Sequence, residues 1–187
     1  MHELDPSQAY PIRAEIFRAA RLCAPCMDRL GVLTFTGSPL NEAARSLWCD
    51  SVLVKHLAPS ISTAHVATTS RGFRELMDVD ALLDNSLSGP TARRSRAAGR
   101  MVALDFRPPA CERALARYCA TQESGESPGH LTTILSARAA VFHIPPHMAL
   151  SALIFLEMRS APVKEFWSCV EACLLRVPAG GHLLRAA

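Results

Sequence analysis

The sequence has 187 residues, of which 49% are hydrophobic and 20% are charged, with a formal net charge of +3. This length suits one domain with a substantial hydrophobic core, and the composition excludes a disordered chain. No segment approaches the roughly 18 to 20 consecutive apolar residues of a membrane-spanning helix. We therefore expect one globular domain over residues 1–187.

The start of the chain lacks the basic and apolar blocks of a secretory signal. The seven cysteines are an odd number, and a chain of this length does not need disulfides to fold. Both features favour a reducing compartment. We therefore expect a cytoplasmic protein.

Apolar residues recur at every third or fourth position, whereas alternation with a period of two is scarce, so the sequence predicts an all-helical fold. Asp5 and Pro6 fit the start of a first helix with an apolar stripe as far as Met27. Pro11 and Pro25 should bend or restart this helix.

Ser38 and Pro39 fit the start of a second helix, which Pro59 should end. Its expected buried face consists of Leu40, Ala43, Ala44, Leu47, Trp48, Val52 and Leu57. A third helix is predicted from Ser62 to Met77, with Val66 pointing inward and two arginines, Arg71 and Arg74, on its polar face.

After a loop at residues 86–90, an arginine-rich helix should run through Met101 and Leu104. Pro108 and Pro109 separate it from a short helix around Leu115 and Tyr118, and residues 122–130 have the composition of a surface linker. Two helices should follow, at residues 131–143 and 148–158, the latter apolar nearly all round and therefore central.

The segment Ser160-Ala161-Pro162 fits the start of a last helix, with Phe166, Trp167, Val170, Cys173 and Leu174 facing inward. The tail from Pro178 should be loose. We expect seven to eight helices in all.

Several short motifs follow one another in an order and spacing that match a known family. They are Asp28-Arg29-Leu30-Gly31, Phe35-Thr36, Asn41, Arg45, Arg71-Gly72-Phe73-Arg74 and His147. This arrangement resembles the glycolipid transfer protein family. The resemblance implies an all-helical sandwich that binds and transfers a sphingolipid without covalent chemistry, enzyme activity, cofactor or metal.

The resemblance also assigns ligand residues. Asn41 stands where the family has an aspartate that contacts the sphingosine amide, and Arg45, one helical turn further, would contact the head group. Thr68 replaces the tryptophan on which sugars stack, whereas Arg71 and Arg74 would suit a phosphate.

His147 would donate a hydrogen bond to the amide carbonyl of the ligand, with His143 as a rival for this role. The implied ligand is a sphingolipid such as ceramide-1-phosphate. We therefore expect transient contact with an anionic membrane surface.

Other interpretations remain open. Seven arginines lie between Arg93 and Arg117 against only Asp105 and Glu112, which fits a helical interaction module for an acidic protein or nucleic acid. Aromatic residues among them are limited to Phe106 and Tyr118, which makes nucleic acid the less favoured partner. The chain could also be a family scaffold that has lost transfer, with solvated arginines and with Gly31 acting only as a helix cap.

Two cysteine pairs bear on metal or redox chemistry. Cys23 and Cys26 are spaced as in redox motifs, and Cys169 and Cys173 are the second pair that a zinc site would require. The first pair follows a helical pattern rather than a strand. We therefore expect buried cysteines that act as small apolar residues.

Overall fold

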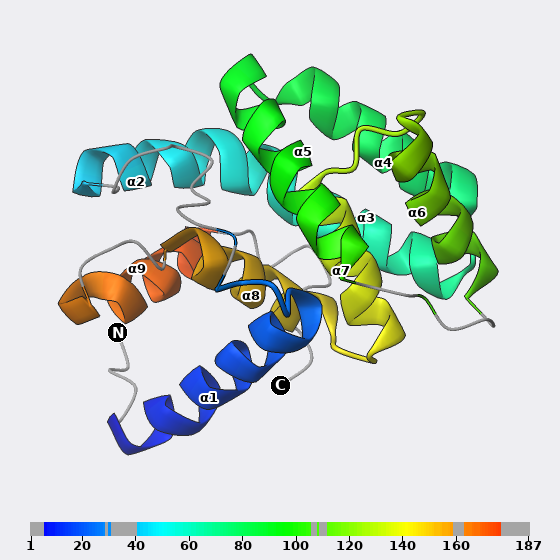
Figure 1. Cartoon of the computed structure of the whole chain (residues 1–187). Coiled ribbons are helices and arrows are strands. Elements are labelled where there is room, and N and C mark those ends of the chain that lie inside the picture. The colour runs from blue at the N-terminus through cyan, green and yellow to red at the C-terminus, as the bar shows by residue number, and fades with distance from the viewer. Residues whose placement is uncertain are drawn as a thin grey trace.

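The computed structural model describes residues 6–28, 30, 41–105, 108, 112–158 and 163–176, with side chains from residue 13 in the first helix and from residue 166 in the last. No strand occurs among them, which confirms the all-helical prediction. The elements (Figure 1) are α1 (Pro6–Cys23), α2 (Glu42–Trp48), the π-helical η1 (Cys49–Leu57), α3 (Ala58–Thr69), α4 (Phe73–Ser86), α5 (Gly89–Leu104), α6 (Arg113–Ser124), α7 (Leu131–Val141), α8 (Pro146–Met158) and α9 (Val163–Arg176).

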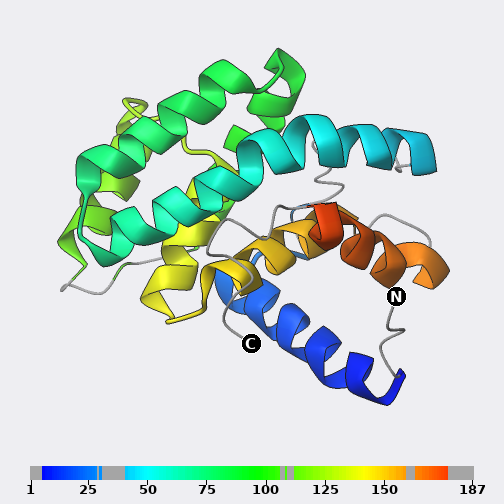
Figure 2. The same cartoon turned by 180° about the vertical axis from the view of Figure 1, so that it is seen from behind.

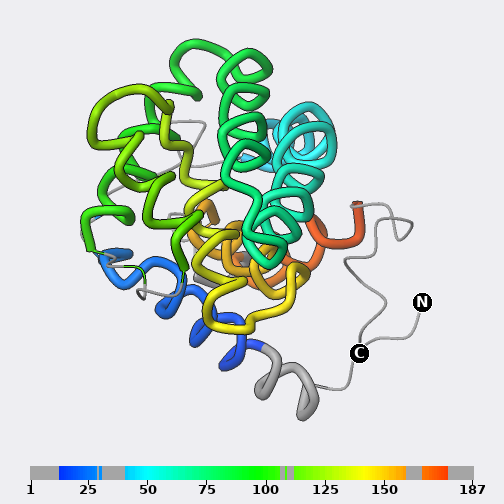
Figure 3. The backbone as a smooth tube through the Cα atoms, turned by 90° about the vertical axis from the view of Figure 1, so that its right-hand side faces the viewer, coloured from blue at the N-terminus to red at the C-terminus, as the bar shows by residue number. Residues whose placement is uncertain are grey.

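Helix α7 lies at the centre of the described fold. Every residue from Leu131 to Ala140 is buried, and α7 packs against α3, α5, α8 and α1. Figure 3 shows it between the green and teal helices on one side and α1, in blue, on the other. A helix enclosed in this way needs no polar stripe, which explains why the sequence of α7 shows no amphipathic pattern.

Helix α8 is the second enclosed element, as its uniformly apolar sequence predicts. All residues from Ala149 to Met158 are buried, and its main neighbours are α1, α7 and α9. The ring of Phe155 packs edge-on against Phe166 of α9 at 5.1 Å between centroids. One continuous hydrophobic core runs from α1 to α9.

Segments α2, η1 and α3 form one uninterrupted helix, coloured cyan to teal in Figure 2. We call these three segments together the long helix. The prediction that Pro59 ends the second helix is therefore wrong. Pro59 lies in the first turn of α3, directly after the π-helical turns, where the Ala58 N–H bonds to the Leu53 carbonyl. The wider π turn moves the preceding carbonyls away from the proline ring, so the helix continues without the missing N–H.

The predicted third helix is divided. Helix α3 ends at Thr69 and α4 begins at Phe73, with Arg71 between them at a φ of 60°. Val66, expected inside, is exposed, and so are Ala43, Ala44 and Leu47 of the predicted second buried face. The recurrence of apolar residues every three or four positions predicted a buried face. It could not show that the first turns of α2 extend beyond the core.

The arginine-rich helix matches α5, and the short helix after Pro108 matches α6. When α2, η1 and α3 are counted as one helix, the described residues contain eight, within the predicted number. The predicted helix start at Ser38 and Pro39, the motif residues Arg29, Gly31, Phe35 and Thr36, and the tail from Pro178 lie outside the described residues. No described helix has the length and apolarity needed to cross a membrane.

Candidate functional site

Asn41 and Arg45, the first two residues assigned to a lipid head group, make contacts within the protein. Asn41 is the N-cap of α2, where its side-chain oxygen accepts a hydrogen bond from the Ala44 N–H at 2.8 Å. Arg45 is half-buried and faces α9, and its Nη1 lies 2.7 Å from Cys169 Sγ. The structure thus gives each a local role at the N-terminal end of the long helix.

Arg71 and Arg74 are both exposed and flank the turn from α3 to α4. The Arg71 N–H bonds to the Thr68 carbonyl at 3.1 Å, and the Gly72 N–H bonds to the Ala67 carbonyl at 2.7 Å. These two bonds define a Schellman motif in which Arg71 occupies the left-handed position that glycine usually takes.

His147 is half-buried in the first turn of α8, and this burial lowers the pKa of its imidazole. Its rival His143 is exposed and occupies the left-handed position after α7, with a φ of 56°. That position terminates the central helix. His143 therefore has a capping role that does not require a ligand.

The five residues do not form one site. Arg45 and Arg71 lie near opposite ends of the continuous helix from α2 to α3, and 26 residues at about 1.5 Å each separate them by roughly 35 to 40 Å. A single polar head group cannot reach both residues. The spacing along the sequence could not show this, because it does not reveal that residues 42–69 form one continuous helix.

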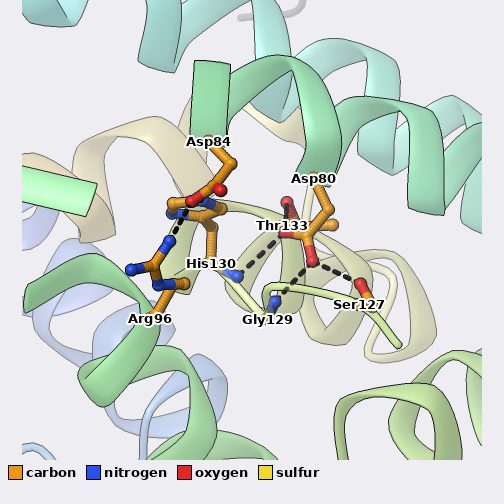
Figure 4. Close-up of polar contacts among 7 residues, drawn as sticks. All are labelled: Asp80, Asp84, Arg96, Ser127, Gly129, His130 and Thr133. Carbon is orange, nitrogen blue, oxygen red and sulfur yellow. Dashed lines mark hydrogen bonds and ion pairs between the residues drawn. The ribbon is translucent and has the colours of Figure 1, made fainter. Parts of the chain in front are cut away.

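The most extensive described polar network surrounds Asp80, a residue of α4 that is 0% exposed. Its carboxylate accepts hydrogen bonds from Ser127 Oγ at 2.6 Å, the Gly129 N–H at 2.6 Å, the His130 N–H at 2.8 Å and Thr133 Oγ1 at 2.9 Å (Figure 4). These donors lie at and just before the start of α7, so Asp80 caps the central helix from a distant part of the chain.

This network corrects the interpretation of residues 122–130 as a surface linker. Helix α6 continues to Ser124, and Ser127, Gly129 and His130 are buried. The segment has the polar, glycine-containing composition of a loop because it presents donors to a buried carboxylate. An exposed linker and a buried segment that donates to a carboxylate can have the same composition. They differ only in the acceptor, Asp80, which lies on another helix and cannot be identified from sequence spacing.

A second carboxylate extends the network toward α5. Asp84, one turn after Asp80, forms an ion pair with Arg96 and lies 3.2 Å from His130 Nε2 (Figure 4). Arg96 is therefore engaged within the protein, unlike the exposed Arg93 and Arg100 on the same helix. The donors around Asp80 and Asp84 therefore fix α4, α5 and the start of α7 relative to one another.

The buried imidazole of His130 predicts acid sensitivity. Burial lowers its pKa, although the carboxylates of Asp80 and Asp84 oppose this shift. An unfolded histidine titrates near pH 6.5, so below that pH the unfolded state binds more protons and stability falls as the pH falls. The free energy of unfolding, measured with denaturant at about pH 7.5 and about pH 5.5, should be lower at the acidic pH.

His130→Gln should reduce this pH-dependent loss, because it removes the buried imidazole. An equal pH dependence in wild type and His130→Gln would contradict the assignment of the effect to His130.

Four exposed arginines gather around the N-terminal end of α4. The guanidinium carbon of Arg117 on α6 lies 4.4 Å from the centroid of the Phe73 ring, which places the two helices side by side. Arg113 lies one turn before Arg117, and Arg71 and Arg74 flank Phe73 in the sequence. We call Arg71, Arg74, Arg113 and Arg117 the arginine cluster. Within the described part of the chain, none of the four forms an ion pair.

The arginine-rich segment is thus divided into two surfaces. Arg113 and Arg117 belong to the arginine cluster, whereas Arg93 and Arg94 lie in the first turns of α5, which follows the opposite, C-terminal end of α4. Arg107 lies outside the described residues. The sequence predicted the charge excess but not its combination with Arg71 and Arg74.

A groove runs between the long helix and α4. One part has a volume of about 440 Å³ and is bordered by Lys55 and His56 on one wall, Asp78 on the other, and Val79 and Leu83. A second hollow of about 310 Å³ extends along α3 past Val66 to Ser70, next to Arg71. Thr63 and Glu75 line both. The groove therefore extends as far as Ser70, which precedes Arg71 in the sequence.

The cysteine pairs do not form a metal centre among the described residues, where no group of three or more histidine, cysteine, aspartate or glutamate side chains is placed to hold an ion. Cys23 and Cys26 are buried at the end of α1, and burial raises the pKa of Cys23 to about 12. These two cysteines fit the predicted role of small apolar residues. Cys169 and Cys173 instead lie against the long helix, near Arg45 and Cys49.

Fold and geometry together define a class: an all-helical protein with an internally capped central helix, one basic cluster and an adjoining groove. Comparison with known proteins gives no significant match, whether to a protein-family model, to a curated protein or to a solved structure.

Proposed function

We propose that this protein is a non-enzymatic helical interaction domain that docks an acidic protein segment through the arginine cluster. The observation that carries the proposal is the packing of Arg117 on Phe73, which brings two exposed arginines of α6 beside Arg71 and Arg74, with no ion pair at any of the four in the described chain. Like charges that gather without internal counterions raise the local positive potential and attract an anionic partner.

The backbone of Arg71 supports this proposal. A left-handed conformation costs a non-glycine residue roughly 1 to 2 kcal/mol, and glycine would relieve that cost. The chain instead has an arginine there, and its side chain is exposed. The turn therefore keeps the Arg71 side chain exposed between α3 and α4, where its charge adds to that of the arginine cluster.

The surroundings favour a protein over a nucleic acid. Tyr118 is fully buried, and the half-buried Phe73 is covered by Arg117, so neither offers a free face on which a base could stack. An acidic segment that also carries apolar side chains fits both the arginine cluster and the groove, in which Val66 and Leu82 are exposed.

The proposal is tested by the affinity for a fluorescent glutamate- and leucine-rich peptide. Arg113→Gln combined with Arg117→Gln should weaken binding about tenfold or more, because two exposed charges are lost from the contact surface, and binding should fall as salt rises. The matched control combines Arg93→Gln and Arg100→Gln on α5, which removes the same charge outside the cluster.

An equal loss of peptide affinity in the two double variants would mean that binding depends on net charge alone, which would overturn the proposal. Tighter binding of an RNA oligonucleotide than of the peptide, lost in the same cluster variant, would replace the acidic protein with a nucleic acid.

A second candidate is the sphingolipid carrier with a glycolipid-transfer-like helical sandwich that the sequence motifs imply. The groove favours it, because a volume of about 440 Å³ lies within the range of small-molecule sites and both Val79 and Leu83 line it. Native mass spectrometry after incubation with ceramide-1-phosphate vesicles, compared with glucosylceramide vesicles, tests this candidate. A bound lipid that is lost on Arg71→Ala would favour the carrier over the interaction domain.

A further inference from the structure

A regular series of contacts joins the start of the long helix to α9. Arg45 Nη1 lies 2.7 Å from Cys169 Sγ, and Cys49 Sγ lies 2.7 Å from Cys173 Sγ. Asp50 Oδ1 lies 3.7 Å from Arg176 Nη1, which also bonds to the Ser46 hydroxyl at 2.9 Å. Residues one turn apart on one helix thus meet residues one turn apart on the other, so the two helices run in register.

The cysteine pair at the centre of this series is close to bonding distance. A covalent S–S bond measures about 2.05 Å, so the two sulfurs need to approach by less than about 1 Å. The flanking contacts of Cys169 and Arg176 hold α9 against the long helix on both sides of the pair.

The two thiols differ in acidity. The pKa of Cys49 is lowered, chiefly by its hydrogen bond with Cys173, with Arg176 and Arg45 contributing, although burial opposes the shift. The pKa of Cys173 is raised by the same hydrogen bond and by burial. Cys23 and Cys119 differ from Cys49 because burial raises their pKa values, to about 12 for Cys23 and about 11 for Cys119. Cys49 is therefore the favoured nucleophile of the pair.

We propose that Cys49 and Cys173 form a reversible disulfide by exchange with a low-molecular-weight disulfide such as oxidised glutathione. The Cys49 thiolate attacks one sulfur of the reagent, forming a mixed disulfide and releasing one glutathione thiolate. The Cys173 thiol then loses its proton and attacks the Cys49 sulfur, releasing the second glutathione. Two electrons pass to the reagent, and the two thiol protons end on the two released glutathione molecules.

Both sulfurs are buried, so the reagent enters when α9 opens locally from the long helix. Helix α9 packs mainly against α8 and η1, at the periphery of the described fold (Figure 1). Once formed, the bond links positions 124 residues apart in the sequence and fixes α9 on the long helix. The oxidised protein should therefore unfold at a higher temperature than the reduced protein.

The test treats the full-length reduced protein with increasing ratios of oxidised to reduced glutathione under native conditions. Intact mass should show the loss of two hydrogen atoms, and peptide mapping should place the bond between Cys49 and Cys173. Cys173→Ser should instead accumulate a glutathione adduct on Cys49, since the second step is blocked. Cys119→Ser, which removes another buried thiol, should leave the bond unchanged.

A disulfide mapped to any other pair, or an unchanged mass at the most oxidising ratio, would overturn the proposal. The mapping of wild-type protein does not depend on the folding of any variant. The arginine cluster is not involved, so failure here leaves the proposed docking function untouched.

Discussion

Asp80→Ala should lower the free energy of unfolding by roughly 4 kcal/mol or more, one of the two largest effects expected of a single substitution in this protein. The variant removes the acceptor of two backbone N–H groups, from Gly129 and His130, and of two hydroxyls, from Ser127 and Thr133. These donors are buried, so water cannot replace the carboxylate without cost. Urea unfolding followed by circular dichroism measures the change.

Asp78→Ala supplies the matched control, because Asp78 is an exposed acid on the same helix. It should change stability by no more than about 0.5 kcal/mol. Asp80→Asn should be intermediate between wild type and Asp80→Ala, since it keeps the shape and one acceptor but loses the charge and directs an amide donor toward other donors. Similar stabilities for Asp80→Ala and Asp78→Ala would contradict the assignment of Asp80 as the cap of α7.

Gly99→Ala should destabilise the protein by about 3 kcal/mol, because α5 crosses the start of α7 at this glycine. A Cβ atom there would lie 2.1 Å from the Gly129 carbonyl oxygen and 2.7 Å from both the His130 carbonyl carbon and the Leu131 nitrogen. All three are backbone atoms of the segment that Asp80 caps. They cannot move away without weakening that network. Thermal and denaturant unfolding report the loss.

Gly89→Ala is the control on the same helix. A Cβ atom there meets only the flexible end of Arg93, at 3.6 Å. The variant should be between unchanged and about 1 kcal/mol more stable, since alanine favours the helix. If Gly99→Ala were as stable as Gly89→Ala, the close crossing of α5 and α7 would be disproved.

The sequence predicted the elements whose local pattern agrees with their surroundings. Helix α8 is largely apolar and is buried from Ala149 to Met158, and α5 begins at Gly89, within the predicted loop at residues 86–90 that precedes the arginine-rich helix. Pro59 misled the prediction because a π-helical turn precedes it. Residues 122–130 misled it because their donors bind Asp80, which lies on another helix. In the first case an unusual helical turn overrides the local preference of the sequence, and in the second case a distant acceptor does.

The candidate site was less predictable than the fold. Arg71 and Arg74 belong to the arginine cluster, but Arg113 and Arg117 join them only because α6 packs beside the start of α4. The sequence could not show this packing. The family resemblance implied that Asn41 is a ligand residue, yet in the structure Asn41 accepts a capping hydrogen bond, which the sequence preference for asparagine at an N-cap would also predict.

Oxidation and docking involve different parts of the protein. The cysteine pair lies near the N-terminal end of the long helix, whereas Arg71 follows its C-terminal end. A partner held at the arginine cluster would therefore leave α9 free to open. The two proposals can be tested in one preparation, because glutathione treatment and peptide binding have separate readouts.

The most direct test of the docking proposal is an amide NMR titration of the full-length protein with the glutamate- and leucine-rich peptide. The account predicts that shift changes concentrate at Arg71, Arg74, Arg113 and Arg117 and along the groove at Val66. Changes centred on Arg93 and Arg100, or spread evenly over all exposed arginines, would contradict it.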